Sequence, residues 1–285
     1  MGKDYYSTGV QQQIETEYSI YFSATMNHSK TSLFNQNNTI ENWENIVKQV
    51  VSQQAWLARA SVHELSIIQT ATSAVRVAAY WYHFSVFAAD FLCLALSLLQ
   101  NHRNRSYVAQ TVNEELGNGV PEQVHSVLLL EAYKKAGMDK NDILAYPTIE
   151  LDHVLEPFRQ RLLEAKNDYE IAGFFLGFEL LAEHNISHVF ECLQPYECSR
   201  EELRQTAYFQ EHFQIEPEHI KRAITMGMNS CCDAHQIKSM LDTFHHGIAF
   251  WNRFWQVVHQ DVLEPKSFQL KPTVTCSREP VLATP

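Results

Sequence analysis

Apolar side chains recur at helical spacing through most of the chain after residue 40. Trp43, Ile46 and Val50, for example, follow each other at intervals of three and four residues and predict a helix over about 41–59. No segment alternates between apolar and polar residues as a half-buried strand would. The pattern predicts an all-α protein, a single bundle of about eight or nine helices. The other predicted helices cover about 61–99, 106–116, 122–136, 151–164, 168–193, 201–214, 218–228 and 233–262.

Two changes in composition divide the chain into three parts. Residues 1–40 are rich in Gln, Asn, Ser and Tyr and predict an N-terminal extension, and residues 41–263 form the helical domain. The remaining segment, 264–285, contains four prolines and few side chains to pack, which predicts a loosely ordered tail.

The most apolar segment, Val77–Leu99, is long enough to cross a bilayer, but His83 and Asp90 interrupt it. Because an ionisable side chain in the middle of a membrane is costly, we expect a buried central helix and no membrane contact.

Composition narrows the class of protein. The chain has 9 glycines in 285 residues, about half the usual share, which favours helices over sheets with many tight turns. Its formal net charge of −11 makes nucleic acid an unfavourable partner. The six cysteines form no C-x-x-C pair, and Met1–Val10 does not resemble a signal peptide, so we expect a reducing, cytoplasmic location.

One candidate site lies in the segment His212-Phe-Gln-Ile-Glu216-Pro-Glu-His219. At 100° per residue, the three ligand-type side chains fall within about 60° of each other on one helix face. Two imidazoles and one carboxylate suit iron, manganese or zinc. The alternative is a solvated helix edge, and Pro217 within the motif predicts a kink or a new helix start.

A second candidate pairs Glu115, at the end of one predicted helix, with His125 in the next. A short turn containing Gly117 and Gly119 separates them, so the two side chains can converge across it. The alternative is a charged helix end near an unrelated histidine.

The third candidate is Glu179, a lone carboxylate within a strongly apolar helix. A buried carboxylate has to be paired, protonated or bound to a metal. Glu183 is one turn further on the same face, whereas His184 and His188 point elsewhere on an ideal helix and are expected at the outer surface.

Together these segments provide three carboxylates and three imidazoles from at least three helices. Such a set suits two iron ions with open positions for oxygen. His83 and Asp90 are further candidates for the site or its lining, with a satisfied pair in the core as the alternative. The six predicted metal ligands are Glu115, His125, Glu179, His212, Glu216 and His219.

The order and spacing of these motifs resemble the heme-oxygenase-like diiron oxidase and oxygenase superfamily. The resemblance covers about residues 80–255, and it departs from the family pattern at Glu216, where the family usually has Asp, and at Pro217. The matching positions are Asn113, Glu115, Leu116, Gly117, Gly119, His125 and Leu128 in the first signature, Gly177 and Glu179 in the second, and His212, Glu216 and His219 in the third.

The resemblance implies a seven-helix core that binds two Fe(II) ions in place of heme and activates O2. It further implies C–C cleavage, desaturation or N-oxygenation of a small molecule, which we expect to be an amino acid or a derivative, in a natural-product pathway. A homodimer is compatible with this interpretation.

Three other interpretations remain open at the level of sequence. A thiaminase-like or quinone-cofactor-forming relative would have the same fold and act without a metal. Heme degradation would require an axial ligand, for which His63 is the candidate, and a glycine-rich stretch that we do not find. A non-catalytic helical scaffold would carry its histidines by chance.

Overall fold

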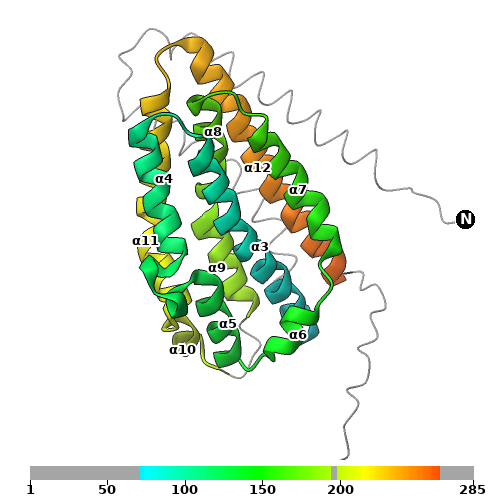
Figure 1. Cartoon of the computed structure of the whole chain (residues 1–285). Helices are drawn as coiled ribbons and strands as arrows, with labels where there is room; N and C mark the ends of the chain where they lie inside the picture. Colours follow the sequence, from blue (N-terminus) through cyan, green and yellow to red (C-terminus); the bar gives the residue numbers. More distant parts are fainter. Residues whose placement is uncertain (1–70, 194–197, 264–285) are drawn as a thin grey trace, which may run out of the picture.

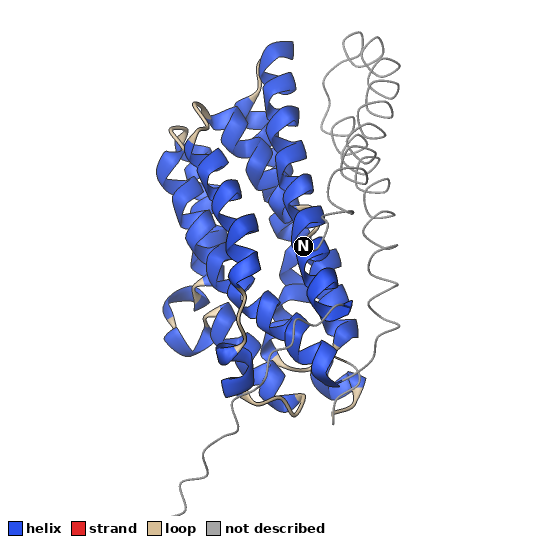
Figure 2. Cartoon of the chain, turned by 90° about the vertical axis from the view of Figure 1, so that its right-hand side faces the viewer, coloured by secondary structure: helices blue, strands red, loops and turns tan. Residues whose placement is uncertain are grey.

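The computed structural model describes residues 71–193 and 198–263, and every regular element in these two ranges is a helix (Figures 1 and 2). The prediction of an all-α bundle is therefore confirmed. The predicted division at residues 40 and 263 is not tested, because residues 1–70 and 264–285 lie outside the described ranges. The described α-helices are α3 (Ala71–Leu98), α4 (His102–Glu115), α5 (His125–Lys135), α6 (Lys140–Ala145), α7 (Ile149–Leu163), α8 (Asp168–Glu179), α9 (Ala182–Cys192), α10 (Arg200–Arg204), α11 (Ala207–Ser230) and α12 (Ala234–Leu263), with short 3₁₀ helices at Gly117–Gly119 and Pro121–Gln123.

The long helices run side by side, with α4 and α11 on one side of the bundle, α7 and α12 on the other, and α3 and α8 between them (Figure 1). Aromatic side chains fill the space between α3, α7, α8 and α12. The rings of Phe158 and Phe250 stack with their centroids 4.3 Å apart, and Trp251 Nε1 donates a hydrogen bond of 3.0 Å to the Phe178 carbonyl. The core between these helices is therefore a dense layer of aromatic side chains that holds α8 against α12.

Helix α3 is the predicted central helix. Its residues 73–98 are long and apolar enough to cross a membrane by length and composition alone. The helix contacts α4, α5, α6, α7, α8, α9 and α12, and Tyr80, Trp81 and Phe91 on its inner face are almost fully buried. These contacts are those of the core helix of a bundle.

Side-chain caps explain two helices whose bounds differ from the prediction. Helix α4 begins at His102, before the predicted start at 106, because the Asn101 side chain accepts hydrogen bonds from the Arg103 and Asn104 amides. Helix α6 lies between the helices predicted over 122–136 and 151–164, where no helix was predicted, and the Asp139 side chain caps it by accepting a hydrogen bond from the Asn141 amide.

The helix predicted over 168–193 is two helices, because the backbone turns at Leu180 and Leu181 between α8 and α9. The turn changes the direction in which later side chains point. His188, which we expected at the outer surface, is 3% exposed and packs against the Trp255 ring at 4.5 Å. Glu183, one turn after Glu179, is exposed.

Burial of His188 predicts a pH dependence of stability. Burial, together with His184, lowers the pKa of His188 from 6.5 to about 3. The unfolded chain then binds more protons between these values, so the contribution of His188 to stability is present above pH 6.5 and is lost as the pH falls. In urea titrations of metal-free protein, we expect the wild type to lose on the order of 1 kcal/mol per pH unit below 6.5 relative to His188→Gln. Parallel pH profiles for the two proteins would refute this.

Helices α8 and α12 are in close backbone contact where two glycines, Gly177 and Gly247, meet. A Cβ atom on Gly177 would lie 2.5 Å from the Phe244 carbonyl oxygen and 2.9 Å from the Gly247 Cα. Only a hydrogen atom fits there, and the backbone contact holds the last turn of α8, which carries Glu179.

We expect Gly177→Ala to lower the free energy of unfolding by about 1–3 kcal/mol, since two backbones have to move apart. Gly227→Ala is the matched control, because its methyl group would meet the flexible Met240 side chain at 3.1 Å. Chemical denaturation measures both variants. If both variants lost the same free energy of unfolding, the backbone contact at Gly177 would not be more sensitive to an added methyl group than the position of Gly227.

Candidate metal centre

The first cluster joins Glu115, the last residue of α4, to His125, the first residue of α5, and to His212 of α11. Potential ligand atoms of these three side chains lie within 4.8 Å of one another. Glu115 Oε2 is 2.8 Å from His125 Nδ1, and the His125 and His212 ring centroids are 4.3 Å apart. We call this cluster the first triad.

The turn between α4 and α5 brings Glu115 to His125. Gly117, Asn118 and Gly119 all have positive φ, at 75°, 54° and 84°, a region that favours glycine and tolerates asparagine. A Cβ atom on Gly117 would lie 2.6 Å from the backbone of Gln123. The predicted convergence of the two side chains across a glycine turn therefore has a clear structural cause.

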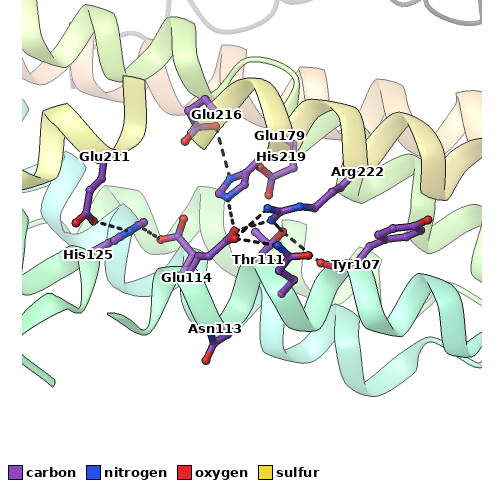
Figure 3. A network of polar contacts seen from close by, with 12 residues as sticks. Tyr107, Thr111, Asn113, Glu114, His125, Glu179, Glu211, Glu216, His219 and Arg222 are labelled. Atoms are coloured by element: carbon purple, nitrogen blue, oxygen red, sulfur yellow. Dashed lines mark hydrogen bonds and ion pairs between the residues drawn. The ribbon is translucent and has the colours of Figure 1, made fainter. Parts of the chain in front are cut away.

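The second triad consists of Glu179 at the end of α8 and of Glu216 and His219 on α11 (Figure 3). Potential ligand atoms of these side chains also lie within 4.8 Å of one another, and all three residues are buried. His219 Nδ1 is 3.4 Å from Glu179 Oε2 and 3.8 Å from Glu216 Oε2. All six side chains that the sequence singled out therefore lie in the two triads.

Helix α11 contributes to both triads because it is continuous from Ala207 to Ser230. The prediction of two helices separated near Pro217 was wrong. Pro217 lies on the exposed face, where the carbonyl group that loses its hydrogen bond can be solvated, while Glu216 and His219 lie on the buried face. Packing of that face against α8 stabilises the helix, so that it continues past Pro217.

The protonation equilibria of the first triad show a strongly polar, buried environment. Burial alone would raise the pKa of Glu115, but attraction and a hydrogen bond from His125 outweigh it and lower the pKa to about 2. Burial and the neighbouring His125 lower the pKa of His212 to about 3. His212 Nδ1 lies 2.7 Å from the Tyr208 carbonyl oxygen, to which it can only donate. The Nε2 lone pair of His212 is then available to a metal.

With both carboxylates ionised, the second triad would carry more negative charge than its single imidazole can balance. Burial raises the pKa of Glu216 well above its usual value, and the carboxylates of Glu179, Glu115 and Glu183 raise it further. Glu216 Oε2 is buried and has no hydrogen-bond partner among the described residues. A buried, unsatisfied carboxylate oxygen facing a second carboxylate and an imidazole fits a divalent cation, which would supply the missing positive charge.

A family model described as "Iron-containing redox enzyme" matches residues 75–252, which include both triads. The chain belongs to this family of iron-containing redox enzymes. Iron is therefore the metal that the description of the family names. No curated protein matches the sequence.

Solved structures support the fold of this iron-containing redox enzyme. A CADD-like protein of unknown function from Nostoc punctiforme is similar with a TM-score of 0.66 and 14% identity, over 78% of this chain and 98% of that one. A domain of unknown function with a heme oxygenase-like fold from Shewanella denitrificans is similar with a TM-score of 0.55 and 15% identity, over 80% of this chain and 94% of that one. These similarities establish the heme-oxygenase-like bundle that the sequence predicted.

Several candidates from the sequence do not lie in the triads. Asp90 and Glu183 are exposed and His83 is half-buried, and none of the three belongs to a metal-type cluster among the described residues. His63, the candidate heme ligand, lies outside the described residues.

Sequence reasoning missed three polar residues beside the triads, two that contact a triad histidine and one that pairs with the first of these. Glu114 Oε2 is 3.0 Å from His219 Nε2, and Arg222 forms an ion pair with Glu114. Glu211, with its side chain 47% exposed, has Oε2 3.7 Å from His125 Nε2. The only signal in the sequence was position: Glu114 and Glu211 each precede a predicted ligand, and Arg222 follows His219 by three residues on one helix.

Proposed function

We propose that this iron-containing redox enzyme binds two Fe(II) ions, one at each triad, and uses O2 to oxidise a small, amino-acid-derived molecule. The observation that carries the proposal is the pairing of two ligand clusters, each with potential ligand atoms within 4.8 Å, on helices α4, α5, α8 and α11. Iron supplies the binding and reduction of O2 when it is present. Oxidation by C–C cleavage, desaturation or N-oxygenation, in a natural-product pathway, is the range of outcomes we propose.

The protein's own side chains prepare the centre for this chemistry. The carboxylates of Glu115, Glu179 and Glu216 give three negative charges against the four positive charges of two Fe(II) ions, which leaves a small residual charge in the core. Buried aromatic rings border the imidazoles, and the Tyr208 ring centroid is 4.1 Å from that of His212. Such a lining excludes water from the oxidising centre.

An amino-acid-derived substrate suits both the aromatic border and the charge of the centre. The Glu211 carboxylate is half-exposed beside His125 and offers a partner for an ammonium group that arrives from solvent. The apolar part of the same molecule would meet aromatic side chains such as Tyr208, which is buried. The alternative, a relative of the same fold that acts without a metal, would not depend on iron, so the test has to separate the two.

Oxygen consumption is the test of the proposed function. Protein purified without metal is loaded anaerobically with Fe(II), exposed to O2 and compared with unloaded protein, and hemin is titrated in parallel. We expect O2 uptake in proportion to bound iron and no Soret band from hemin. Equal O2 uptake with and without iron, or tight binding of hemin, would contradict the proposal.

A further inference from the structure

Glu114 and Glu115 are neighbours on α4, yet they contact different triads. Successive side chains on a helix point about 100° apart, so Glu115 reaches His125. Glu114 instead reaches His219 of the second triad (Figure 3). Glu114 Oε2 lies 3.0 Å from His219 Nε2, on the side of the ring away from Glu179 and Glu216. The imidazole of His219 is thus held from both edges.

Arg222 fixes the Glu114 carboxylate in this position. One turn after His219 on α11, its guanidinium spans the gap to α4, where Nη1 is 2.5 Å from Glu114 Oε2 and Nη2 is 2.9 Å from Oε1. Nη1 also donates to Thr111 Oγ1 at 3.3 Å. The Glu114 and Arg222 side chains are each 12% exposed, and a two-pronged ion pair of this kind fixes geometry as well as charge.

A carboxylate only accepts hydrogen bonds, so the His219 nitrogen that faces Glu114 carries the proton. A metal would therefore take the place of a proton on Nδ1, the atom that faces Glu179 and Glu216, while the proton on Nε2 stays with Glu114. His212 is held in the opposite way, because its Nδ1 donates to the Tyr208 carbonyl. The two triads would thus bind metal through different imidazole nitrogens.

We propose that Glu114 and Arg222 are positioning residues that orient His219 so that Nδ1 is the metal-binding atom of the second triad. The inference rests on the proposed function, since it requires a metal at that triad. Both oxygens of Glu114 accept bonds from Arg222, and Oε1 also accepts from Gln110 at 3.2 Å. Glu114 is therefore engaged as an acceptor, while its charge is balanced by Arg222 and adds no net charge to the triad.

Two substitutions of Glu114 separate its hydrogen bond from its charge. Glu114→Asp keeps the charge that pairs with Arg222 but withdraws the acceptor from His219 by one methylene group. Glu114→Gln keeps an acceptor oxygen of the right reach and leaves Arg222 unpaired. A purely structural role for the ion pair would make the glutamine variant the worse of the two.

The test is an anaerobic Co(II) titration followed by visible absorption, in a His212→Ala background that leaves only the second triad. We expect Glu114→Asp to weaken Co(II) binding by about 10-fold or more and to alter the absorption bands, while Glu114→Gln stays close to the parent. Glu218→Gln is the matched control, since this neighbour of His219 is 58% exposed and pairs with Lys221. Circular dichroism verifies that each variant is folded.

The outcomes separate this inference from the proposed function. Suppose that the protein with both triads intact binds two Co(II) ions. If, in the His212→Ala background, Glu114→Asp leaves the Co(II) affinity unchanged, or Glu114→Gln lowers it more than Glu114→Asp does, the positioning role is refuted and the two-metal centre stands. If the protein with both triads intact binds fewer than two Co(II) ions, the proposed function itself fails.

Discussion

Substitution of His212 by alanine is expected to abolish iron-dependent oxidation while the helical content stays intact. His212 is 4% exposed, and its Nδ1 is fixed by the Tyr208 carbonyl. Loss of its Nε2 leaves the first triad with one imidazole and one carboxylate. Because the loss of a residue that only orients a ligand costs about 10–100-fold in metal affinity, the loss of the ligand itself is expected to cost at least about 100-fold. Metal content and O2 uptake measure the effect.

The matched control for this variant is His153→Ala, which removes an exposed histidine from α7. The control is expected to keep its iron and its activity. Glu179→Ala is expected to have the same effect as His212→Ala, but at the second triad. Full activity in either triad variant would remove that residue from the centre.

Glu216→Gln is expected to stabilise the metal-free protein and to remove the stabilisation that metal provides. In the absence of metal, Glu216 Oε2 is buried without a hydrogen-bond partner and faces the carboxylate of Glu179. Burial makes Glu216 costly in the metal-free protein, because the group has to lose its water as an anion or take up a proton to become neutral. A neutral amide of the same shape avoids this cost, so the free energy of unfolding at pH 7 should rise by about 1–3 kcal/mol. The same amide is a much weaker ligand for a divalent cation than a carboxylate.

Thermal unfolding with and without Co(II) measures both halves of this prediction. The unfolding temperature of the wild type should rise when Co(II) is added. Glu216→Gln should unfold at a higher temperature than the wild type without metal, and Co(II) should raise that temperature much less. Glu218→Gln, the exposed neighbour of His219, serves again as control and should behave as the wild type. A metal-free Glu216→Gln protein that is less stable than the wild type would show that Glu216 is satisfied without a metal.

The placement of the three candidate ligands on one face of α11 could be predicted because a single helix determines it. His212, Glu216 and His219 lie on one face by the period of 3.6 residues alone, and the helix is long enough for that period to hold. Glu115 and His125 could be paired for a similar reason, since the glycine turn between them is local in sequence. Local geometry therefore carried most of the predicted site.

Features that depend on contacts between distant helices could not be predicted. The turn at Leu180 and Leu181 has no glycine or proline to mark it, and it changed the side to which His188 points. The interaction of Glu114 with His219 joins residues 105 positions apart. Which of two adjacent glutamates faces which triad depends on the packing of α4 against α11, and no periodicity encodes that.

Pro217 shows how packing overrides a local preference. On its own, a proline predicts a break or a kink. The buried face of α11, which carries Glu216 and His219, packs along α8 on the side away from the proline ring. The helix therefore continues, and the spacing of the motif is preserved.

The number of iron ions held by each chain tests the central claim most directly. Protein reconstituted anaerobically with Fe(II) and freed of excess metal is analysed for iron and protein in the same sample, alongside His212→Ala and Glu179→Ala. We predict two iron ions per wild-type chain and one in each variant, because each substitution disables one triad. A wild-type chain that holds one iron or none, or variants that still hold two, would contradict the two-triad centre.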